Sequence, residues 1–376
     1  MGSSGTATAA GTGEAGGTAP GPGSAAGPWQ RLLTDAVSRG RPLAGFHNSN
    51  YVLERAGGHA RLLDVDPGTP LKVRVRRGAL TVVERAWSDE GAILAALDRT
   101  EAVRGTPRHY AGAGEACVHE YVPGVALSQV CPPGKPLERR YVEAVAAHLA
   151  SFGAVRLADL PPLPAGWAAD GDSRAFLLGR VRFTDTRVRG AHEADFGGLL
   201  GALGVPERAL DDYAARLPAL TRRPFALLHA DLHRGNLIVR DDGDLAVVDW
   251  ELALWGDPLH DLAVHLVRTR YPDDQRDEAV RAWRDAVEPA AAAGLADDLP
   301  VYIGYEYAQS LYADTLRAAH GLSEHPEPAA LDAAARWVRD ALWRAAAPLR
   351  LDRVPTLTEV ERALLAWARR RAGARP

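Results

Sequence analysis

The spacing of hydrophobic positions changes once along the chain, near residue 137. Between residues 43 and 87, short apolar runs alternate with polar positions in LAGF, YVLE, LKVRVRR and LTVVERAW, and turns rich in Gly and Pro separate them. EACVHEYV, residues 115–122, predicts another strand. SDEGAILAALDRT, residues 88–100, predicts one helix with Ser88 as its N-cap. The pattern therefore predicts a small sheet with one helix inserted.

After residue 137, apolar residues recur at helical spacing. One region from 225 to 250 departs from this pattern, with the strand-like runs FALLH, NLIV and LAVVDW. The sequence Asp241-Asp242-Gly243-Asp244 predicts a hairpin turn between the last two runs. Helices are expected at 138–152, 193–216, 275–292, 299–320, 329–347 and 357–372. The pattern thus predicts an α+β protein with a small β-rich lobe and a large, mainly helical lobe.

Composition excludes several classes of protein. The 376 residues carry a net charge of −4, so no basic excess indicates a nucleic-acid partner. No apolar run approaches the roughly 18 residues that span a bilayer, so no membrane partner is expected. Cys117 and Cys131 lack a zinc spacing and are expected to be reduced thiols in a cytoplasmic protein. Residues 1–28 hold one charged residue and are expected to form a disordered tail.

The segment HADLHRGN, residues 229–236, places several polar side chains between two apolar runs. Asp231 is followed by Asn236 after four intervening residues, and Asp249 follows in VVDWE at the end of the next strand. Such a segment can be a turn, a metal site or a catalytic loop. A carboxylate can orient an attacking hydroxyl group, while an amide oxygen and a second carboxylate hold Mg²⁺ against nucleotide phosphates. This spacing favours a catalytic loop for phosphoryl transfer.

HADLHRGN and VVDWE, with GDPLHDLA at residues 256–263, resemble the aminoglycoside phosphotransferase and choline kinase-like family. The resemblance covers roughly residues 40–350 and implies a bilobal protein-kinase-like fold. The expected divisions are a tail at 1–28, a nucleotide-binding N-lobe at 29–118, a hinge at 119–124, and a helical C-lobe at 125–376 with the catalytic loop and acceptor site.

The resemblance implies roles for the motif residues. Asp231 is expected to be the catalytic base or hydroxyl-orienting residue, and Asn236 and Asp249 are expected to bind Mg²⁺, with assistance from Glu251. His229 is expected to brace the loop, and Asp261 is expected to be a structural hydrogen-bond acceptor. The predicted cofactors are Mg²⁺ and ATP or GTP.

The nucleotide-binding residues are expected in the small lobe. GFHNSNYV, residues 45–52, resembles the family's nucleotide-covering loop, and its Asn48 and Ser49 are expected near the phosphates. Lys72, Arg74 and Arg85 are alternative phosphate-binding cations. Glu90 is the expected ion-pair partner, and the backbone from Glu120 to Val122 is expected to contact the base.

Four residues are candidates for binding the acceptor substrate: His233, Glu251, Glu306 and Asp314. Carboxylates are expected among them because the resemblance implies that family members acting on cationic antibiotics line the acceptor site with carboxylates. The resulting hypothesis is a small-molecule kinase, monomeric or homodimeric, that phosphorylates an antibiotic such as an aminoglycoside in resistance or self-protection. The alternatives are a kinase of choline, a sugar or a nucleoside, a non-catalytic nucleotide-binding module, and a metal-dependent phosphohydrolase using His229, Asp231 and His233.

Overall fold

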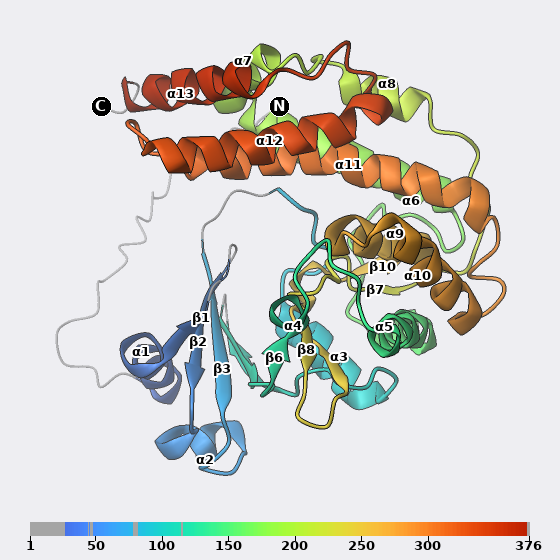
Figure 1. Cartoon of the computed structure of the whole chain (residues 1–376). Coiled ribbons are helices and arrows are strands. Elements are labelled where there is room, and N and C mark those ends of the chain that lie inside the picture. Colours follow the sequence, from blue (N-terminus) through green and yellow to red (C-terminus); the bar gives the residue numbers. More distant parts are fainter. Residues whose placement is uncertain (1–26, 44, 46–47, 78–81, 114–115, 374–376) are drawn as a thin grey trace, which may run out of the picture.

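The computed structural model describes residues 27–43, 45, 48–77, 82–113 and 116–373 (Figure 1). It contains an antiparallel sheet near the N-terminus and a mainly helical remainder, which confirms the predicted fold class. The tail predicted at 1–28 lies outside the described residues except for its last two. Within the described part of the chain, no helix is both long enough and apolar enough to cross a membrane.

The small lobe is built on five antiparallel strands in the order β1-β2-β3-β5-β4. The strands are β1 (Arg41–Leu43), β2 (Asn48–Leu53), β3 (Leu71–Arg76), β4 (His109–Ala113) and β5 (Ala116–Glu120). Arg74 of β3 lies opposite Asn50 of β2 and Cys117 of β5. Because side chains alternate across a strand, Lys72 and Arg74 share one face of the sheet.

The two faces of this sheet have different coverings. Leu71, Val73 and Val118 point to a buried apolar face, which packs against α1 (Pro28–Arg39) and α2 (Ala60–Leu63). The opposite, polar face is turned toward α3 (Glu90–Thr100), which contacts both β5 and the segment 250–252 of the large lobe. The sheet therefore presents its cations toward the junction of the two lobes.

Two predictions for this lobe were wrong. The strand expected over LTVVERAW is absent from its described residues, 82–87, which form an irregular segment. Val82 and Trp87 are buried in the core of the large lobe, where the Trp87 indole donates a hydrogen bond to the Pro161 carbonyl over 3.0 Å. The cap of α3 is Asp89 in place of Ser88, because the Asp89 carboxylate accepts from the N–H of Gly91. Helix α1 and strand β4 were not predicted.

The large lobe is helical around a few short strands. The helices are α4 (Leu127–Val130), α5 (Arg139–Ser151), α6 (Ser173–Phe183), α7 (Glu193–Ala202), α8 (Ala209–Ala215), α9 (Pro258–Thr269), α10 (Asp273–Ala286), α11 (Leu295–His320), α12 (Pro328–Leu349) and α13 (Leu357–Gly373). Each predicted helix is found, although the segment 193–216 divides into α7 and α8 before and after Pro206. Helices α6 and α9 were missed. Figure 1 shows α11, α12 and α13 in the upper part of the molecule, with α7 and α8 beside them.

The predicted strand region, 225–250, is confirmed. Strand β7 (Ala226–Leu228) pairs with β10 (Leu254–Gly256), and β8 (Leu237–Val239) pairs with β9 (Leu245–Val247) through the predicted hairpin turn. Strand β8 also pairs with β6 (Val125–Ala126), the first element after the predicted hinge. Gly124 has a φ of 140°, and an added Cβ would lie 2.4 Å from the Val239 carbonyl oxygen. A glycine is thus required where the chain enters the large lobe.

A buried arginine joins three parts of the large lobe. Arg223, just before β7, forms ion pairs with Asp257 at the start of α9 and Asp298 at the start of α11. Its guanidinium also donates to the Ala293 carbonyl over 2.9 Å, and the Tyr302 hydroxyl donates to Asp257 over 2.7 Å. Because α9 carries residues that support the catalytic loop, this cluster fixes the base of the site.

Substitution Arg223→Ala should lower the free energy of unfolding by about 3–5 kcal/mol, because two buried carboxylates would lose their counter-charge. Urea unfolding monitored by circular dichroism measures this loss. Arg222→Ala is the matched control, since Arg222 is the adjacent residue and its side chain is exposed. Similar stability in the two variants would show that the cluster does not hold these helices together.

Candidate active site

The loop from β7 to β8 is held by one carboxylate of α9. Asp261 accepts hydrogen bonds from the backbone N–H groups of His229 and Ala230, each over 2.7 Å. Ala230 has a left-handed φ of 57°, which turns the two successive N–H groups toward the same acceptor. Burial raises the pKa of Asp261 to about 7, against the effect of its two donors. Asp261 is therefore the structural acceptor that the sequence suggested.

His229 braces the same loop from inside. Its Nε2 lies 3.1 Å from the Val248 carbonyl oxygen, and its Nδ1 accepts from the N–H of Asp231 over 3.3 Å. The ring is fully buried and packs 4.8 Å from the Trp250 ring. Burial lowers the pKa of His229, so its neutral form matches this pattern of one donor and one acceptor.

Asp231 and Asn236 lie together at the open side of the loop. The Asn236 Nδ2 donates to the Asp231 carbonyl oxygen over 3.0 Å and lies 3.5 Å from its Oδ2. The Asn236 carbonyl accepts from Val248, which places Asn236 one residue across the hairpin from Asp249. Because its amide nitrogen is engaged, the Asn236 Oδ1 is the atom presented to a ligand. An amide oxygen and a carboxylate such as that of Asp249 are ligands that suit a hard cation such as Mg²⁺.

Asp249 faces the small lobe from the end of this hairpin. Its φ of 72° is left-handed, and its Oδ1 accepts from the Arg74 guanidinium over 3.0 Å. Burial opposes the ionisation of Asp249, but Arg74 and Lys72 outweigh it and hold the pKa of this carboxyl below its usual value. Asp249 is therefore charged across the pH range in which proteins normally function.

Arg74 is the cation that pairs with the helix of the small lobe. It forms an ion pair with Glu90, the first residue of α3, and Glu90 also accepts from the N–H of Trp250 over 2.8 Å. Lys72 lies two residues back along β3, opposite His119 of β5. Arg85 lies 2.6 Å from Glu251. Of the three alternative cations, Arg74 is the one that forms ion pairs with both Glu90 and Asp249.

A cavity of about 250 Å³ lies between these groups. It is lined by Asn48, Arg74, Arg76, Arg85, Ser88, Asp89, Glu90, Ala116, Cys117 and Glu251. Glu251 accepts from Asn48 over 3.0 Å and pairs with Arg74 and Arg85, so it lies here and not with the acceptor candidates. Both roles suggested for Glu251, assisting the metal and binding the substrate, stay predictions.

The other nucleotide candidates are placed less directly. Ser49 points to the opposite face of β2 from Asn48, and its hydroxyl accepts from Arg77 over 2.8 Å. The covering loop around them includes residues 46–47, which lie outside the described residues. Glu120 ends β5, and its N–H is bonded to the Arg108 carbonyl over 2.8 Å. Val122 follows in the segment that leads to β6. The contacts of the hinge with a base stay predictions.

A second cavity, of about 340 Å³, is lined by His233 of the loop and by residues of α9, α11 and α12. His233 and Asp314 both line it, and His233 lies 3.8 Å from the Asp231 carboxylate. Glu306 does not line this cavity. It is buried 3.5 Å from the His260 ring, and burial raises its pKa to about 7 against the opposing effect of Arg268. The four acceptor candidates therefore separate into three locations.

The comparisons with known proteins agree with this architecture. The sequence pattern described as the phosphotransferase enzyme family matches residues 40–295. The chain belongs to this phosphotransferase family. It is therefore an enzyme that transfers phosphate to a hydroxyl group of a small molecule. No curated protein sequence matches the chain.

Solved structures resemble this phosphotransferase at low sequence identity. A putative aminoglycoside phosphotransferase from Ralstonia eutropha JMP134 aligns with a TM-score of 0.53 and 16% identity, over 86% of this chain and 97% of that one. A choline/ethanolamine kinase family protein from Mesorhizobium loti aligns with a TM-score of 0.47 and 16% identity, over 89% of this chain and 95% of that one. Macrolide 2'-phosphotransferase MphH from Brachybacterium faecium aligns with a TM-score of 0.44 and 20% identity, over 80% of this chain and 91% of that one. The first of these supports the fold alone.

Sequence reasoning missed one residue of the phosphotransferase site. Arg268 of α9 lies 3.4 Å from Asp231 Oδ1, and its side chain is 23% exposed. Burial alone would lower its pKa, but Asp231, Glu306 and Asp314 raise it. Arg268 lies seven residues after Asp261, which is two helical turns and the same face. That spacing was the available signal, and it was overlooked because α9 was not predicted.

Substitution Glu306→Gln should remove a pH dependence from the stability of the phosphotransferase. The pKa of Glu306 is raised to about 7 in the folded protein, whereas it is 4.5 in the unfolded chain. The free energy of unfolding of the wild type therefore falls as the pH rises above 4.5, because the unfolded chain ionises more readily than the folded protein. The variant should gain up to about 3 kcal/mol over the wild type between pH 4.5 and 8, with no such gain at lower pH. Urea unfolding at a series of pH values measures this. Glu324→Gln, at an exposed position, is the control, and parallel profiles for all three proteins would contradict the prediction.

Proposed function

We propose that this phosphotransferase moves the γ-phosphoryl group of ATP or GTP to a hydroxyl group of a small molecule, with Mg²⁺ as cofactor. The observation that supports this most strongly is the loop that keeps Asp231 beside Asn236, with Asp249 one strand away. Mg²⁺, when bound by Asn236 and Asp249, would neutralise charge on the phosphates. We also propose that the enzyme works in the cytoplasm, where nucleoside triphosphates are abundant.

The residues divide the work between two cavities. Arg74, held by Glu90 and Asp249, lies on the side proposed for the nucleotide and would balance phosphate charge. Asp231 lies 3.4 Å from Arg268 and 3.8 Å from His233, which both line the second cavity, and it would orient the acceptor hydroxyl and accept its proton. The acceptor oxygen then bonds to the γ-phosphorus as the bond to the leaving oxygen of the nucleoside diphosphate breaks. Arg268 would hold the Asp231 carboxylate in place.

The rival functions are less well supported. Within the described residues, no three His, Cys, Asp or Glu side chains gather as a metal site, which disfavours the phosphohydrolase. Asp231, Asn236 and Asp249 are all present, which disfavours a non-catalytic module. The family resemblance alone suggests an antibiotic acceptor such as an aminoglycoside. A metabolite such as choline, a sugar or a nucleoside offers the same hydroxyl chemistry.

Substitution Asp231→Ala should reduce phosphoryl transfer by about a factor of 10²–10⁴, because the acceptor hydroxyl would lose its proton acceptor. Nucleotide affinity should stay within a few fold of the wild type. Transfer is measured by nucleoside diphosphate release and product mass across aminoglycosides, other antibiotics, choline, sugars, nucleosides and hydroxy acids. Asp241→Ala, in the exposed hairpin turn, is the control. Full activity in the Asp231 variant would refute its role, and nucleotide binding without turnover of any acceptor would favour the non-catalytic module.

Substitution Asp249→Ala should weaken binding of the magnesium-nucleotide complex by at least about tenfold, through loss of a metal ligand. In the presence of EDTA the same change should leave nucleotide affinity equal or higher, because it removes a negative charge next to the phosphates. Isothermal titration calorimetry with a non-hydrolysable nucleotide, with and without Mg²⁺, separates the two effects. An equal loss under both conditions would indicate that Asp249 serves only to hold Arg74.

A further inference from the structure

The second cavity is built from the loop and three helices, and two of its lining residues lie close to the proposed catalytic carboxylate. Arg268 and His233, which both line it, approach Asp231 to 3.4 and 3.8 Å. The lining residues are His233, Val267, Arg268, Arg270, Tyr307, Ser310, Asp314, Arg317, Trp337, Asp340, Ala341 and Arg344. They come from the loop, from α9 and the residue after it, and from α11 and α12. A molecule bound here would place a hydroxyl group near Asp231.

The charges that line this cavity are predominantly positive. Four arginines face two aspartates. Asp314 pairs with Arg317 over 3.3 Å, but Asp340 alone serves two arginines, Arg270 at 3.2 Å and Arg344 at 3.1 Å. One positive charge around Asp340 is thus not matched by a carboxylate of the lining. Even if Asp231 is counted with Arg268, cations outnumber carboxylates.

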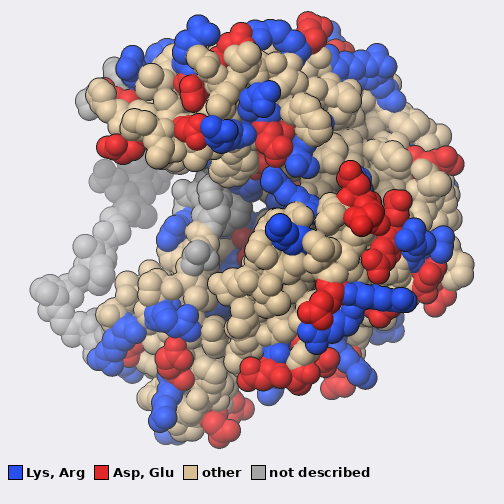
Figure 2. All heavy atoms as spheres, in the orientation of Figure 1, with Lys and Arg blue, Asp and Glu red and all other residues tan. Residues whose placement is uncertain are grey.

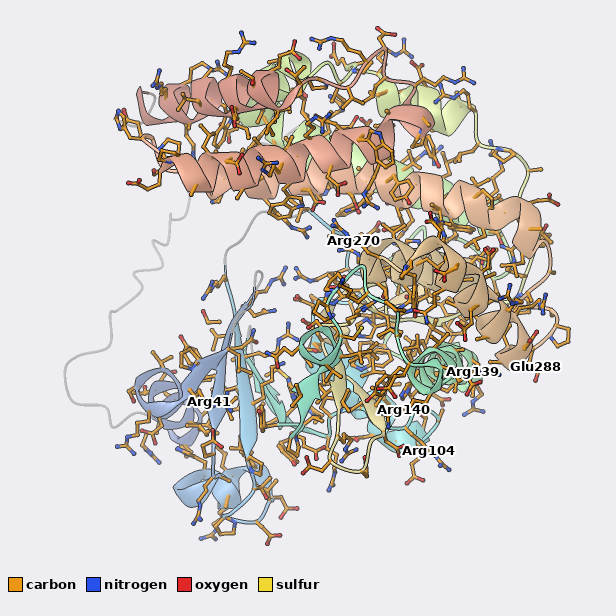
Figure 3. The ribbon with its side chains drawn as sticks, in the orientation of Figure 1. Arg41, Arg104, Arg139, Arg140, Arg270 and Glu288 are labelled. Carbon is orange, nitrogen blue, oxygen red and sulfur yellow. The ribbon has the colours of Figure 1, made fainter. Side chains whose placement is uncertain are left out.

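The unmatched charge lies where a small ligand can reach it. The side chain of Arg344 is 26% exposed, and that of Arg270 is 51% exposed. Figure 3 shows Arg270 near the end of α9, below the layer of α11 and α12, and Figure 2 shows Lys and Arg side chains beside the hollow in this region. A partly shielded guanidinium donates two parallel hydrogen bonds to a carboxylate or phosphate group, which a neutral ligand cannot match.

The same cavity offers aromatic surface. Trp337 is 41% exposed, and the Arg344 guanidinium lies 5.8 Å from the centre of the Tyr307 ring. An exposed tryptophan beside arginines provides a flat contact for a ring or chain of carbons. The lining therefore combines anion recognition with apolar contact, and it disfavours a polycationic amine, which would meet an excess of like charge.

We propose that the acceptor is a small hydroxyl compound that carries a carboxylate or another anionic group. Arg344 and Arg270 bind the anionic group, while the hydroxyl group lies at Asp231. The inference rests on the proposed phosphotransferase function and assigns the charge class of its acceptor. This proposal replaces the carboxylate-lined acceptor site expected from the sequence. Only one of the expected carboxylates, Asp314, lines the cavity, and it forms an ion pair with Arg317.

The test measures binding, so that it does not depend on turnover. The probes are two matched sets, para-hydroxybenzoate with its amide and with para-hydroxybenzylamine, and hydroxycyclohexane carboxylate with its amide and its aminomethyl counterpart. Isothermal titration calorimetry is carried out on the full chain with a non-hydrolysable nucleotide and Mg²⁺. In at least one set, the carboxylate should bind at least about tenfold more tightly than the amide, and the amine should bind most weakly.

Substitution Arg344→Gln should remove most of this preference for the carboxylate, while leaving amide binding and nucleotide binding unchanged. Arg270→Gln should reduce the preference in the same direction. Arg339→Gln is the matched control, because it removes the same charge from an exposed position on α12 that does not line the cavity. Urea unfolding of each variant checks that the fold is retained.

Equal binding of the three members of each set, or a preference for the amines, would overturn the proposal. So would failure of both carboxylates to bind at millimolar concentration, or an Arg344 variant that behaves like the Arg339 control. These outcomes are distinct from failure of the proposed function. A chain that binds carboxylates through Arg344 but transfers no phosphate would keep the anion site and lose the kinase assignment.

Discussion

The site depends on the two hydrogen bonds that Asp261 accepts from the backbone of the catalytic loop. They fix Ala230 in a left-handed conformation, and this turn sets the direction of Asp231. A buried carboxylate is costly, and here the cost is offset by two N–H donors that would otherwise be buried without partners. His229 closes the same loop from the other side through Val248. The loop is rigid because both of its supports are buried and both use backbone groups.

This support also explains why α9 is central to the large lobe. Asp257 begins the helix and is held by Arg223, Asp261 holds the loop one turn later, and Arg268 reaches Asp231 two turns after that. One rigid helix thus carries the anchor to the core, the brace of the loop and the cation beside the catalytic carboxylate. A change in packing at Arg223 would therefore be transmitted to the site through a single element.

The parts of the site that the sequence predicted are those set by local geometry. Asp231, Asn236 and Asp249 lie on one short loop and the hairpin that follows, so their spacing alone brings them together. The prediction of a strand over 80–87 was wrong because Val82 and Trp87 do not face a sheet. Their apolar side chains are buried in the core of the large lobe. The second cavity could not be predicted from spacing, because Arg268, Arg317 and Arg344 come from three helices and meet only through tertiary packing.

The two cavities differ in their balance of charge, and this difference agrees with the ligand proposed for each. The cavity beside Arg74 is lined by three arginines and three carboxylates, so its charges are matched, which suits the proposed phosphate chain that arrives with its own cation. Around Asp340 they are not matched, so any ligand that completes the balance must bring a negative charge itself. Arg268 lies beside the Asp231 carboxylate and also lines the second cavity, so this one residue links the proposed catalytic group to the proposed acceptor site.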